Sequence, residues 1–140
     1  MAIKKPLEGK IAIITGGGRG LGRAMALGFA RAGAKGITIT ASRNPDEIKA
    51  VAAEIEDIAG PGSSLPLIAD VTDRAACGEA VRQTAERFGA VDVLVNNAGR
   101  GQRSMTNDSA PFWEGNPEGW AEIVDTNVNG PFNMAHSAIH

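Results

Sequence analysis

Four short apolar runs alternate along the chain with longer segments of mixed polarity. The runs predict strands at Lys10–Thr15, Gly36–Ala41, Leu65–Ala69 and Val91–Asn96. The runs are short and largely continuous, which is typical of strands that are covered on both faces in a parallel sheet.

The segments between these runs carry the signals of helix ends. We expect helices at Gly20–Ala32, Pro45–Ala59 and Asp73–Phe88, and a fourth helix from about Asn116 to the end of the chain. Asn44 is a suitable N-cap before Pro45, and Gly33 and Gly89 are suitable C-terminal stops. The polar stretch of residues 100–115 is expected to be a loop.

The alternating order of strands and helices predicts an α/β fold, with a doubly wound parallel sheet and right-handed crossovers. In such sheets, ligands bind beyond the carboxyl ends of the strands. One residue falls at each of the four expected strand ends: Gly16, Ser42, Asp70 and Asn97. We therefore expect these four residues to surround one binding site.

The turn after the first strand is the most informative of these ends. Its sequence is Thr15-Gly16-Gly17-Gly18-Arg19-Gly20-Leu21-Gly22. Gly16, Gly20 and Gly22 allow the backbone to turn tightly and to approach a bulky anion closely. The helix that opens at the turn directs free N–H groups and a partial positive charge at that anion. Because the turn joins a buried strand to a helix, it predicts a dinucleotide site.

The end of the second strand indicates which dinucleotide is bound. An acidic residue about 20 positions beyond the glycine turn would hydrogen-bond a ribose diol and favour NAD, but Ser42 and Arg43 stand there instead. Ser42 can hydrogen-bond a 2′-phosphate, Arg43 can pair with it bidentately, and Arg19 adds a second cation. We therefore expect NADP(H) rather than NAD(H). The alternative is that Arg43 is a solvated charge in front of a helix.

The third and fourth strand ends also carry candidate ligand-binding residues. Asp70 can accept a hydrogen bond from an adenine amino group while Val71 covers the ring. The alternative is that Asp70 is an ordinary helix-capping residue. The small residues Asn97, Ala98 and Gly99 leave room for a sugar and a nicotinamide. The paired asparagine side chains of this segment can tie strand ends together and hydrogen-bond a ribose.

Pro131 interrupts the last expected helix. Proline has no N–H and cannot bond the carbonyl of Asn127, so we expect the helix to bend there, helped by Gly130. The freed carbonyl would be an acceptor for a water near the nicotinamide. Alternatively, Pro131 starts a separate helix after a break at Asn129–Gly130.

Composition excludes several other classes of protein. A chain of 140 residues with 43% hydrophobic residues is expected to form one domain. A net charge of −2 gives no electrostatic reason to bind nucleic acid or a membrane surface, and no apolar run approaches the roughly 18 residues of a membrane span. The single cysteine, Cys77, is expected to be a buried or half-buried helix residue and fits a reducing compartment, so we expect a cytoplasmic protein. No metal site is expected.

Together these motifs resemble the short-chain dehydrogenases/reductases. The resemblance rests on Thr15-Gly16-x-x-x-Gly20-x-Gly22, Asp70-Val71, Asn96-Asn97-Ala98-Gly99 and Asn127-Val128-Asn129-Gly130, in this order and spacing. It implies a Rossmann-like sheet with strand order 3-2-1-4. It also implies that the glycine turn holds the pyrophosphate, that Asp70 and Val71 bind adenine, and that Asn97 to Gly99 flank the nicotinamide ribose. Asn127 matches the family's catalytic asparagine, which helps to hold a proton-relay water, and Ser42 and Arg43 match the NADP-preferring branch.

The resemblance also implies that important residues lie outside this sequence. The family's catalytic Ser and its Tyr-x-x-x-Lys pair follow the catalytic asparagine, whereas the 140 residues contain no tyrosine. Residues 1–140 are therefore expected to be the NADP-binding Rossmann half, inactive alone, of an enzyme that interconverts an alcohol and a ketone or aldehyde. Such enzymes are commonly homo-oligomers, dimers or tetramers. The alternatives are a non-catalytic dinucleotide-binding regulator and a decayed fragment.

Overall fold

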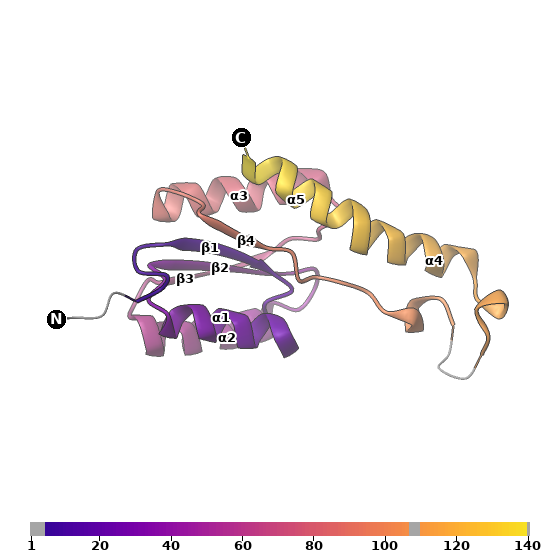
Figure 1. Ribbon diagram of the computed structural model, residues 1–140, viewed down its shortest axis with the longest axis horizontal. Helices are drawn as coiled ribbons and strands as arrows, with labels where there is room; N and C mark the ends of the chain where they lie inside the picture. Colours follow the sequence, from indigo (N-terminus) through magenta and orange to yellow (C-terminus); the bar gives the residue numbers. More distant parts are fainter. Residues whose placement is uncertain (1–4, 107–109, 140) are drawn as a thin grey trace.

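The computed structural model describes residues 5–106 and 110–139, and this part of the chain contains a parallel sheet flanked by helices (Figure 1). The strands are β1 (Ile11–Thr15), β2 (Gly36–Ala41), β3 (Ser64–Ile68) and β4 (Val93–Val95). Their order across the sheet is β3-β2-β1-β4, and every pairing is parallel. The expected α/β class and the strand order 3-2-1-4 are confirmed.

Helices cover both faces of the sheet. In Figure 1, α1 (Gly20–Arg31) and α2 (Pro45–Ala59) lie on one face, and α3 (Arg74–Phe88) and α5 (Gly130–Ile139) lie on the other. Side chains of successive strand residues point to opposite faces. Ile14 accordingly packs in the cluster under α1 and α2, whereas Ile13 packs with Met134 of α5 on the opposite face.

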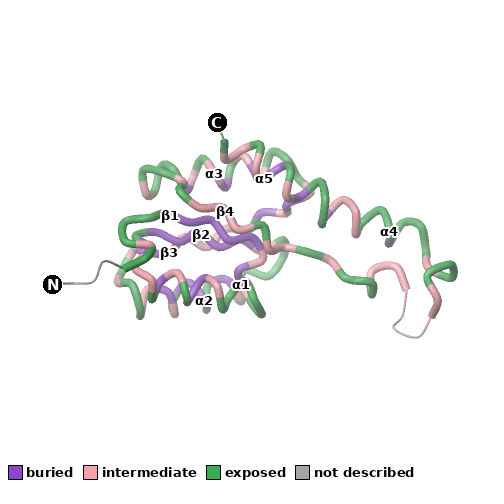
Figure 2. The backbone as a smooth tube through the Cα atoms, viewed as in Figure 1, coloured by how far each residue is buried: buried purple, intermediate pink, exposed green. Residues whose placement is uncertain are grey.

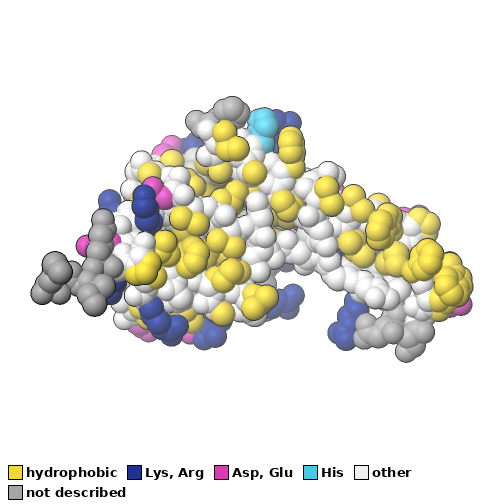
Figure 3. Space-filling model, in the orientation of Figure 1, with side chains coloured by type: hydrophobic (Ala, Val, Ile, Leu, Met, Phe, Trp, Pro, Cys, Tyr) yellow, Lys and Arg dark blue, Asp and Glu magenta, His cyan; other side chains and the backbone are white. Residues whose placement is uncertain are grey.

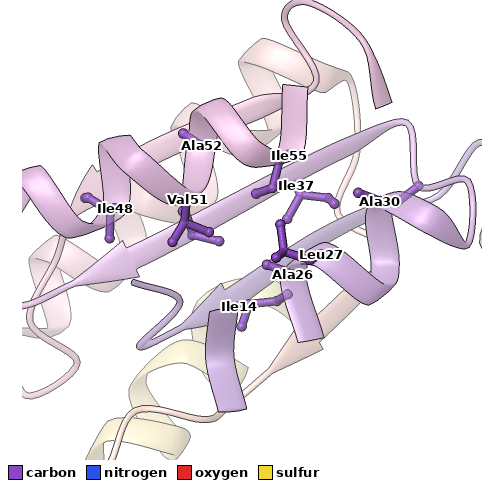
Figure 4. Close-up of a cluster of buried hydrophobic side chains, with 11 residues drawn as sticks. Ile14, Ala26, Leu27, Ala30, Ile37, Ile48, Val51, Ala52 and Ile55 are labelled. Carbon is purple, nitrogen blue, oxygen red and sulfur yellow. The ribbon is translucent and has the colours of Figure 1, made fainter. Parts of the chain in front are cut away.

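The larger core lies between the sheet, α1 and α2. Figure 4 shows Ile14 and Ile37 of the sheet among the side chains of these helices, with Leu27 from α1 and Val51 and Ile55 from α2. Ile37 and Ile55 are fully buried. Each such side chain contributes about 1.5–3 kcal/mol on burial. Figure 2 shows that the buried positions concentrate in the sheet and on the inner faces of its helices.

The second core contains the single cysteine. Cys77 of α3 is fully buried beside Ile13 and Met134, as expected from the sequence. Burial raises the pKa of its thiol to about 11, with further increases from the charges of Asp73 and Asp70. The thiol therefore stays protonated at neutral pH.

The helix ends agree closely with the sequence signals. Asn44 and Asp73 accept hydrogen bonds from backbone N–H groups in the first turns of α2 and α3. Asn116 does the same for α4 (Pro117–Val124). The largest difference concerns β4, which spans Val93–Val95 rather than Val91–Asn96. Before this strand, the N–H of Asp92 still donates to the Ile11 carbonyl at 2.9 Å, but the N–H of Ile11 donates to the Asp92 carboxylate, at 2.9 Å, instead of to a backbone carbonyl.

The described residues between β4 and α4 are largely irregular, as expected. They include short 3-10 turns at Gln102–Ser104 and Phe112–Glu114. In Figure 1 this segment and α4 project beyond the end of the sheet. No helix in the described part of the chain is long and apolar enough to cross a membrane.

The chain does not break before Pro131. It passes from α4 into a π-helical turn, η3 (Asp125–Asn129), and continues directly into α5. The N–H of Gly130 donates to the carbonyl of Asp125, five residues back, and Gly130 has helical dihedral angles (φ −56°, ψ −56°). The alternative of a separate helix after a break at Asn129–Gly130 is therefore wrong. A π-helical turn is one way in which a helix accommodates a proline without losing its continuity.

Candidate functional site

A groove of about 720 Å³ opens at the carboxyl ends of the strands. Gly16, Ser42, Asp70 and Asn97, one from each strand end, all line it. The four residues therefore meet in one groove, as the parallel sheet predicts. The carboxyl ends of parallel strands share one edge of the sheet, which is why residues so far apart in sequence meet there.

Backbone packing explains why the glycine turn needs its glycines. At Gly22, a Cβ atom would lie far inside contact distance of the carbonyl oxygen of Gly16 and 2.7 Å from Nδ2 of Asn97. Gly16 and Gly20 have positive φ angles of 64° and 54°, which side-chain-bearing residues rarely adopt. The first turn of α1 can therefore approach the end of β1 closely only with glycine at these positions.

The N-terminus of α1 is the one among α1 to α4 without a side-chain cap. Arg19 occupies the N-cap position in an extended conformation and makes no capping hydrogen bond, and the first turn contains no acidic residue. Asparagine or aspartate side chains cap α2, α3 and α4. The N–H groups and the positive end of the α1 dipole therefore remain available to an anion in the groove.

Thr15 and Asn97 fasten the ends of β1 and β4 to each other. The Thr15 hydroxyl oxygen accepts hydrogen bonds from the N–H groups of Asn97 and Ala98, both at 3.0 Å. The Asn97 side chain donates to the carbonyls of Thr15 and Gly16, at 3.0 and 3.1 Å. This confirms that an asparagine of this segment ties strand ends together. Thr15 is buried beneath the groove and acts on its shape rather than lining it.

The groove is lined by both positive and negative side chains near the end of β2. Ser42 and Arg43 line the groove, and Arg19 faces it from the glycine turn. All three residues are exposed. The carboxylate residue Glu47, from the first turn of α2, lines the same groove, and the sequence analysis did not select it. Its position three residues after the N-cap Asn44 was the available signal, because that places it on the first helical turn beside the strand end.

Two hydrogen bonds fix the carboxylate of Asp70 at the end of β3. Its Oδ1 accepts hydrogen bonds from the backbone N–H and the hydroxyl of Thr72, at 3.0 and 2.8 Å. The backbone hydrogen bond from Thr72 is the main reason that the pKa of Asp70 lies below its ordinary value, and the charges of Arg100 and Arg43 also lower it. Asp73, rather than Asp70, caps α3. The interpretation of Asp70 as an ordinary helix cap is therefore wrong.

Asn127 lies in η3, beside the groove rather than among its lining residues. Its side-chain oxygen accepts the N–H of Arg100 at 2.8 Å, and its side-chain nitrogen donates to the carbonyl of Arg100 at 2.9 Å. Arg100 itself lines the groove and forms an ion pair with Glu122 of α4 at 3.0 Å. Sequence reasoning did not select Arg100, although it directly follows Asn97-Ala98-Gly99.

Most of the remaining predicted residues also line the groove, namely Gly18, Gly20, Leu21, Val71, Ala98 and Gly99. Gly22 is buried and does not line it. Beyond Glu47 and Arg100, the groove is completed by residues that were not selected for it, namely Thr40, Ala41, Asn44, Ala69, Gly101 and Thr126.

Comparison with known protein families matches residues 10–140 to the family described as short chain dehydrogenase. The chain belongs to this family. Its members are oxidoreductases that bind a nicotinamide dinucleotide. The expectation raised by the motifs of the glycine turn and of the β3 and β4 ends is thereby confirmed at the level of the family.

Individual relatives agree with this membership. The short chain dehydrogenase tazN of Aspergillus terreus is 41% identical over 135 residues, which are 95% of this chain and 28% of that protein. The 3-oxoacyl-(acyl-carrier-protein) reductase FabG of Thermotoga maritima is 35% identical over 133 residues, which are 95% of this chain and 50% of that protein. A crystal structure of 3-ketoacyl-(acyl-carrier-protein) reductase from Brucella melitensis, complexed with NADH, is 39% identical, with a TM-score of 0.79. This likeness covers 95% of the present chain and 50% of that protein.

The chain spans half or less of the length of these three proteins. The matched part of the family contains the glycine turn, the four strand ends and the helix that carries Asn127.

Proposed function

We propose that the intact protein is an NADP(H)-dependent oxidoreductase that interconverts an alcohol and a ketone or aldehyde. Residues 1–140 form its cofactor-binding Rossmann domain. The observation that carries this proposal is the groove in which the uncapped end of α1 and the pair Ser42 and Arg43 face the same space. The two features supply the two kinds of anion-binding group that a phosphorylated dinucleotide needs.

Each part of a dinucleotide can be assigned to residues at the strand ends. The pyrophosphate takes the N–H groups at the start of α1, where Thr15, Gly16, Gly18, Gly20, Leu21 and Gly22 shape the turn. The adenine lies at the end of β3, where Asp70 accepts from its amino group and Val71 covers the ring. Asn97, Ala98 and Gly99 flank the nicotinamide ribose at the end of β4. Main-chain and small side-chain contacts dominate because the ligand must approach the backbone closely.

The side chains at the end of β2 favour a 2′-phosphate. Arg43 can bind it bidentately, Ser42 can donate to it, and Arg19 adds charge from the glycine turn. Glu47 supports the second candidate, NAD(H), because a carboxylate in this region can accept hydrogen bonds from a ribose diol. Arg43, Arg19 and Ser42 favour NADP(H), and Glu47 favours NAD(H), so NADP(H) is the preferred assignment.

Cofactor binding by three variants of the intact protein tests this assignment. An Arg–phosphate contact contributes roughly 1.5–3 kcal/mol, so Arg43→Ala should weaken NADPH binding by about one to two decades and leave NADH nearly unchanged. Glu47→Gln should weaken NADH more than NADPH. Lys49→Ala, which removes an exposed cation of α2 outside the groove, is the matched control and should change neither. Equal losses for both cofactors in Arg43→Ala would contradict the 2′-phosphate assignment.

The residues of this chain bind and orient the dinucleotide. The groups that transfer the substrate proton are expected elsewhere in the intact protein. A nicotinamide dinucleotide carries the hydride when it is bound. Near its reactive end, Pro131 offers no N–H to the Asn127 carbonyl, which is therefore proposed to hold a proton-relay water. Because the 140 residues contain no tyrosine, we expect this chain alone not to turn over.

The competing proposal is a regulator that binds the dinucleotide without chemistry. The two are separated by NADPH oxidation, followed at 340 nm, when the intact protein is given a panel of ketones and aldehydes. Turnover of any member supports the oxidoreductase, whereas tight NADPH binding without turnover of the whole panel supports the regulator.

We further propose that the intact protein is a cytoplasmic homo-oligomer. Large apolar side chains are exposed along the continuous helical segment from α4 to α5, namely Trp120, Val128, Phe132 and Ile139. Figure 3 shows apolar side chains gathered over the projecting α4 region. Sedimentation of the intact protein tests the assembly, and a monomer at micromolar concentration would contradict it.

A further inference from the structure

The peptide unit between Val71 and Thr72 is held at both of its ends. Its N–H, which belongs to Thr72, donates to Oδ1 of Asp70 at 3.0 Å. Its carbonyl oxygen, which belongs to Val71, accepts a hydrogen bond from Nδ2 of Asn133 at 3.0 Å. The first partner belongs to the candidate adenine site, and the second comes from α5, on the far side of the turn.

Asn133 makes this contact from inside the protein. It is buried, with 9% of its surface exposed, and it lies one turn before Ser137, whose hydroxyl donates to the Asn133 carbonyl at 2.9 Å. The Val71 side chain is buried against the same helix, because a Cβ on Gly130 would lie 2.6 Å from Cγ2 of Val71. The turn after β3 therefore rests on α5 through both the side chain and the carbonyl of Val71.

A peptide unit is planar, so fixing its carbonyl also fixes the direction of its N–H. With the Val71 carbonyl held by Asn133, the Thr72 N–H points at Asp70 and binds Oδ1. The Thr72 hydroxyl reinforces the same oxygen at 2.8 Å. Among the described residues, no group donates to the other carboxylate oxygen, Oδ2, so Asp70 presents it with a fixed orientation at the groove.

We propose that Asn133 is a positioning residue that orients Asp70 for the adenine of the cofactor, acting through the Val71–Thr72 peptide. This inference rests on the proposed dinucleotide function. In this proposal, α5 supports the adenine site through Asn133. Loss of the Asn133 amide would leave the Val71 carbonyl with the weaker thiol donor of Cys77, at 3.4 Å, and would loosen the Val71–Thr72 peptide.

Binding measurements on the intact protein separate this role from a general loss of structure. The probes are NADPH, adenosine 2′,5′-bisphosphate for the adenine half and reduced nicotinamide mononucleotide for the other half. Asn133→Leu, which keeps the branched shape of the side chain but removes the donor, should weaken the affinity for NADPH and for adenosine 2′,5′-bisphosphate by about three- to tenfold, the effect of one hydrogen bond. It should leave the third unchanged, and kcat at saturating NADPH should also be unchanged.

Two comparisons sharpen the test. Ser137→Ala removes a hydrogen bond on the same helix without touching the turn, and it should change none of the three affinities. In an Asp70→Ala background, Asn133→Leu should have no further effect, because the residue that it positions is gone. If Asn133→Leu does not fold, Asn133→Ser takes its place, since its hydroxyl ends one bond nearer the helix and does not reach the carbonyl.

Hydrogen exchange at the Thr72 amide tests, without any ligand, whether Asn133 fixes the Val71–Thr72 peptide. It should be faster in Asn133→Leu than in the wild type or Ser137→Ala. Unchanged exchange, equal losses for all three probes or additive effects with Asp70→Ala would each overturn the proposal. Faster exchange in a protein whose wild type binds no NADPH would instead contradict the proposed function, and with it the adenine role of Asp70.

Discussion

The side-chain amide of Asn127 pairs with both backbone groups of Arg100, accepting its N–H at 2.8 Å and donating to its carbonyl at 2.9 Å. The pair joins the π-helical turn η3 to the segment that leaves β4. The Asn127 side chain also leaves little room for a larger residue at position 99, because a Cβ added to Gly99 would lie 3.3 Å from the Asn127 side-chain oxygen. The residue that the family resemblance marks as catalytic thus also fixes one wall of the groove.

We expect Asn127→Ala to lower the free energy of unfolding of the intact protein by about 1 kcal/mol, because it removes two hydrogen bonds at an exposed site. The Arg100 amide should then exchange faster with solvent. Asn127→Asp is the matched control, since it retains an acceptor for the Arg100 N–H and should keep that amide protected. The same exchange rate in both variants would show that the Asn127 oxygen does not hold Arg100.

Two glycines of α1 should respond to alanine in opposite directions. Gly22→Ala places a methyl group against the Gly16 carbonyl, so we expect a loss of about 3 kcal/mol or more and loss of NADPH binding. At Gly28, an added Cβ would meet nothing within 4 Å among the described residues apart from the backbone of its own helix, so Gly28→Ala should stabilise the helix by up to about 1 kcal/mol. Urea unfolding measures both. A Gly22→Ala protein as stable as the wild type would contradict the close packing of α1 on β1.

The isolated 140-residue chain should associate through its edge strand. β4 lies at one edge of the sheet, and its three residues Val93–Val95 are apolar and only partly buried. An apolar edge strand presents unpaired backbone groups that bind other strands. Sedimentation velocity should therefore show association or poor solubility at micromolar concentration. A monodisperse monomer that unfolds cooperatively would show that the half-sheet is self-sufficient.

The carboxylate of Asp70 should contribute to stability in a pH-dependent way. Its hydrogen bonds with Thr72 hold its pKa below the ordinary value of 3.8, so the folded state favours the ionised form. The contribution is therefore fully present above that value and is lost as the pH falls through the lower pKa of the folded state. The difference in unfolding free energy between the wild type and Asp70→Asn should be constant from pH 7 to pH 5 and should narrow below 3.8. A difference that grows on acidification would contradict the assignment.

The sequence by itself determined the class of fold and most residues of the groove that is the candidate site. The apolar runs, the caps at Asn44 and Asp73 and the stop at Gly89 are local signals, and each acts on the few residues around it. The strand ends could also be predicted as a site, because parallel strands place their carboxyl ends on one edge whatever the side chains between them. Gly16, Ser42, Asp70 and Asn97 therefore meet in the groove as expected.

Only the tertiary structure decided which distant groups complete that site. Glu47 and Arg100 line the groove because the first turn of α2 and the segment that leaves β4 lie next to the strand ends. Pro131 predicted a disturbance of the helix, but the form of this disturbance depended on packing. With Gly130 against Val71 and Asn127 bonded to Arg100, the chain takes a π-helical turn rather than a break. The bond from Asn133 to the Val71 carbonyl spans 62 positions, and contacts of this kind leave no local pattern in the sequence because their partners meet only when the chain is folded.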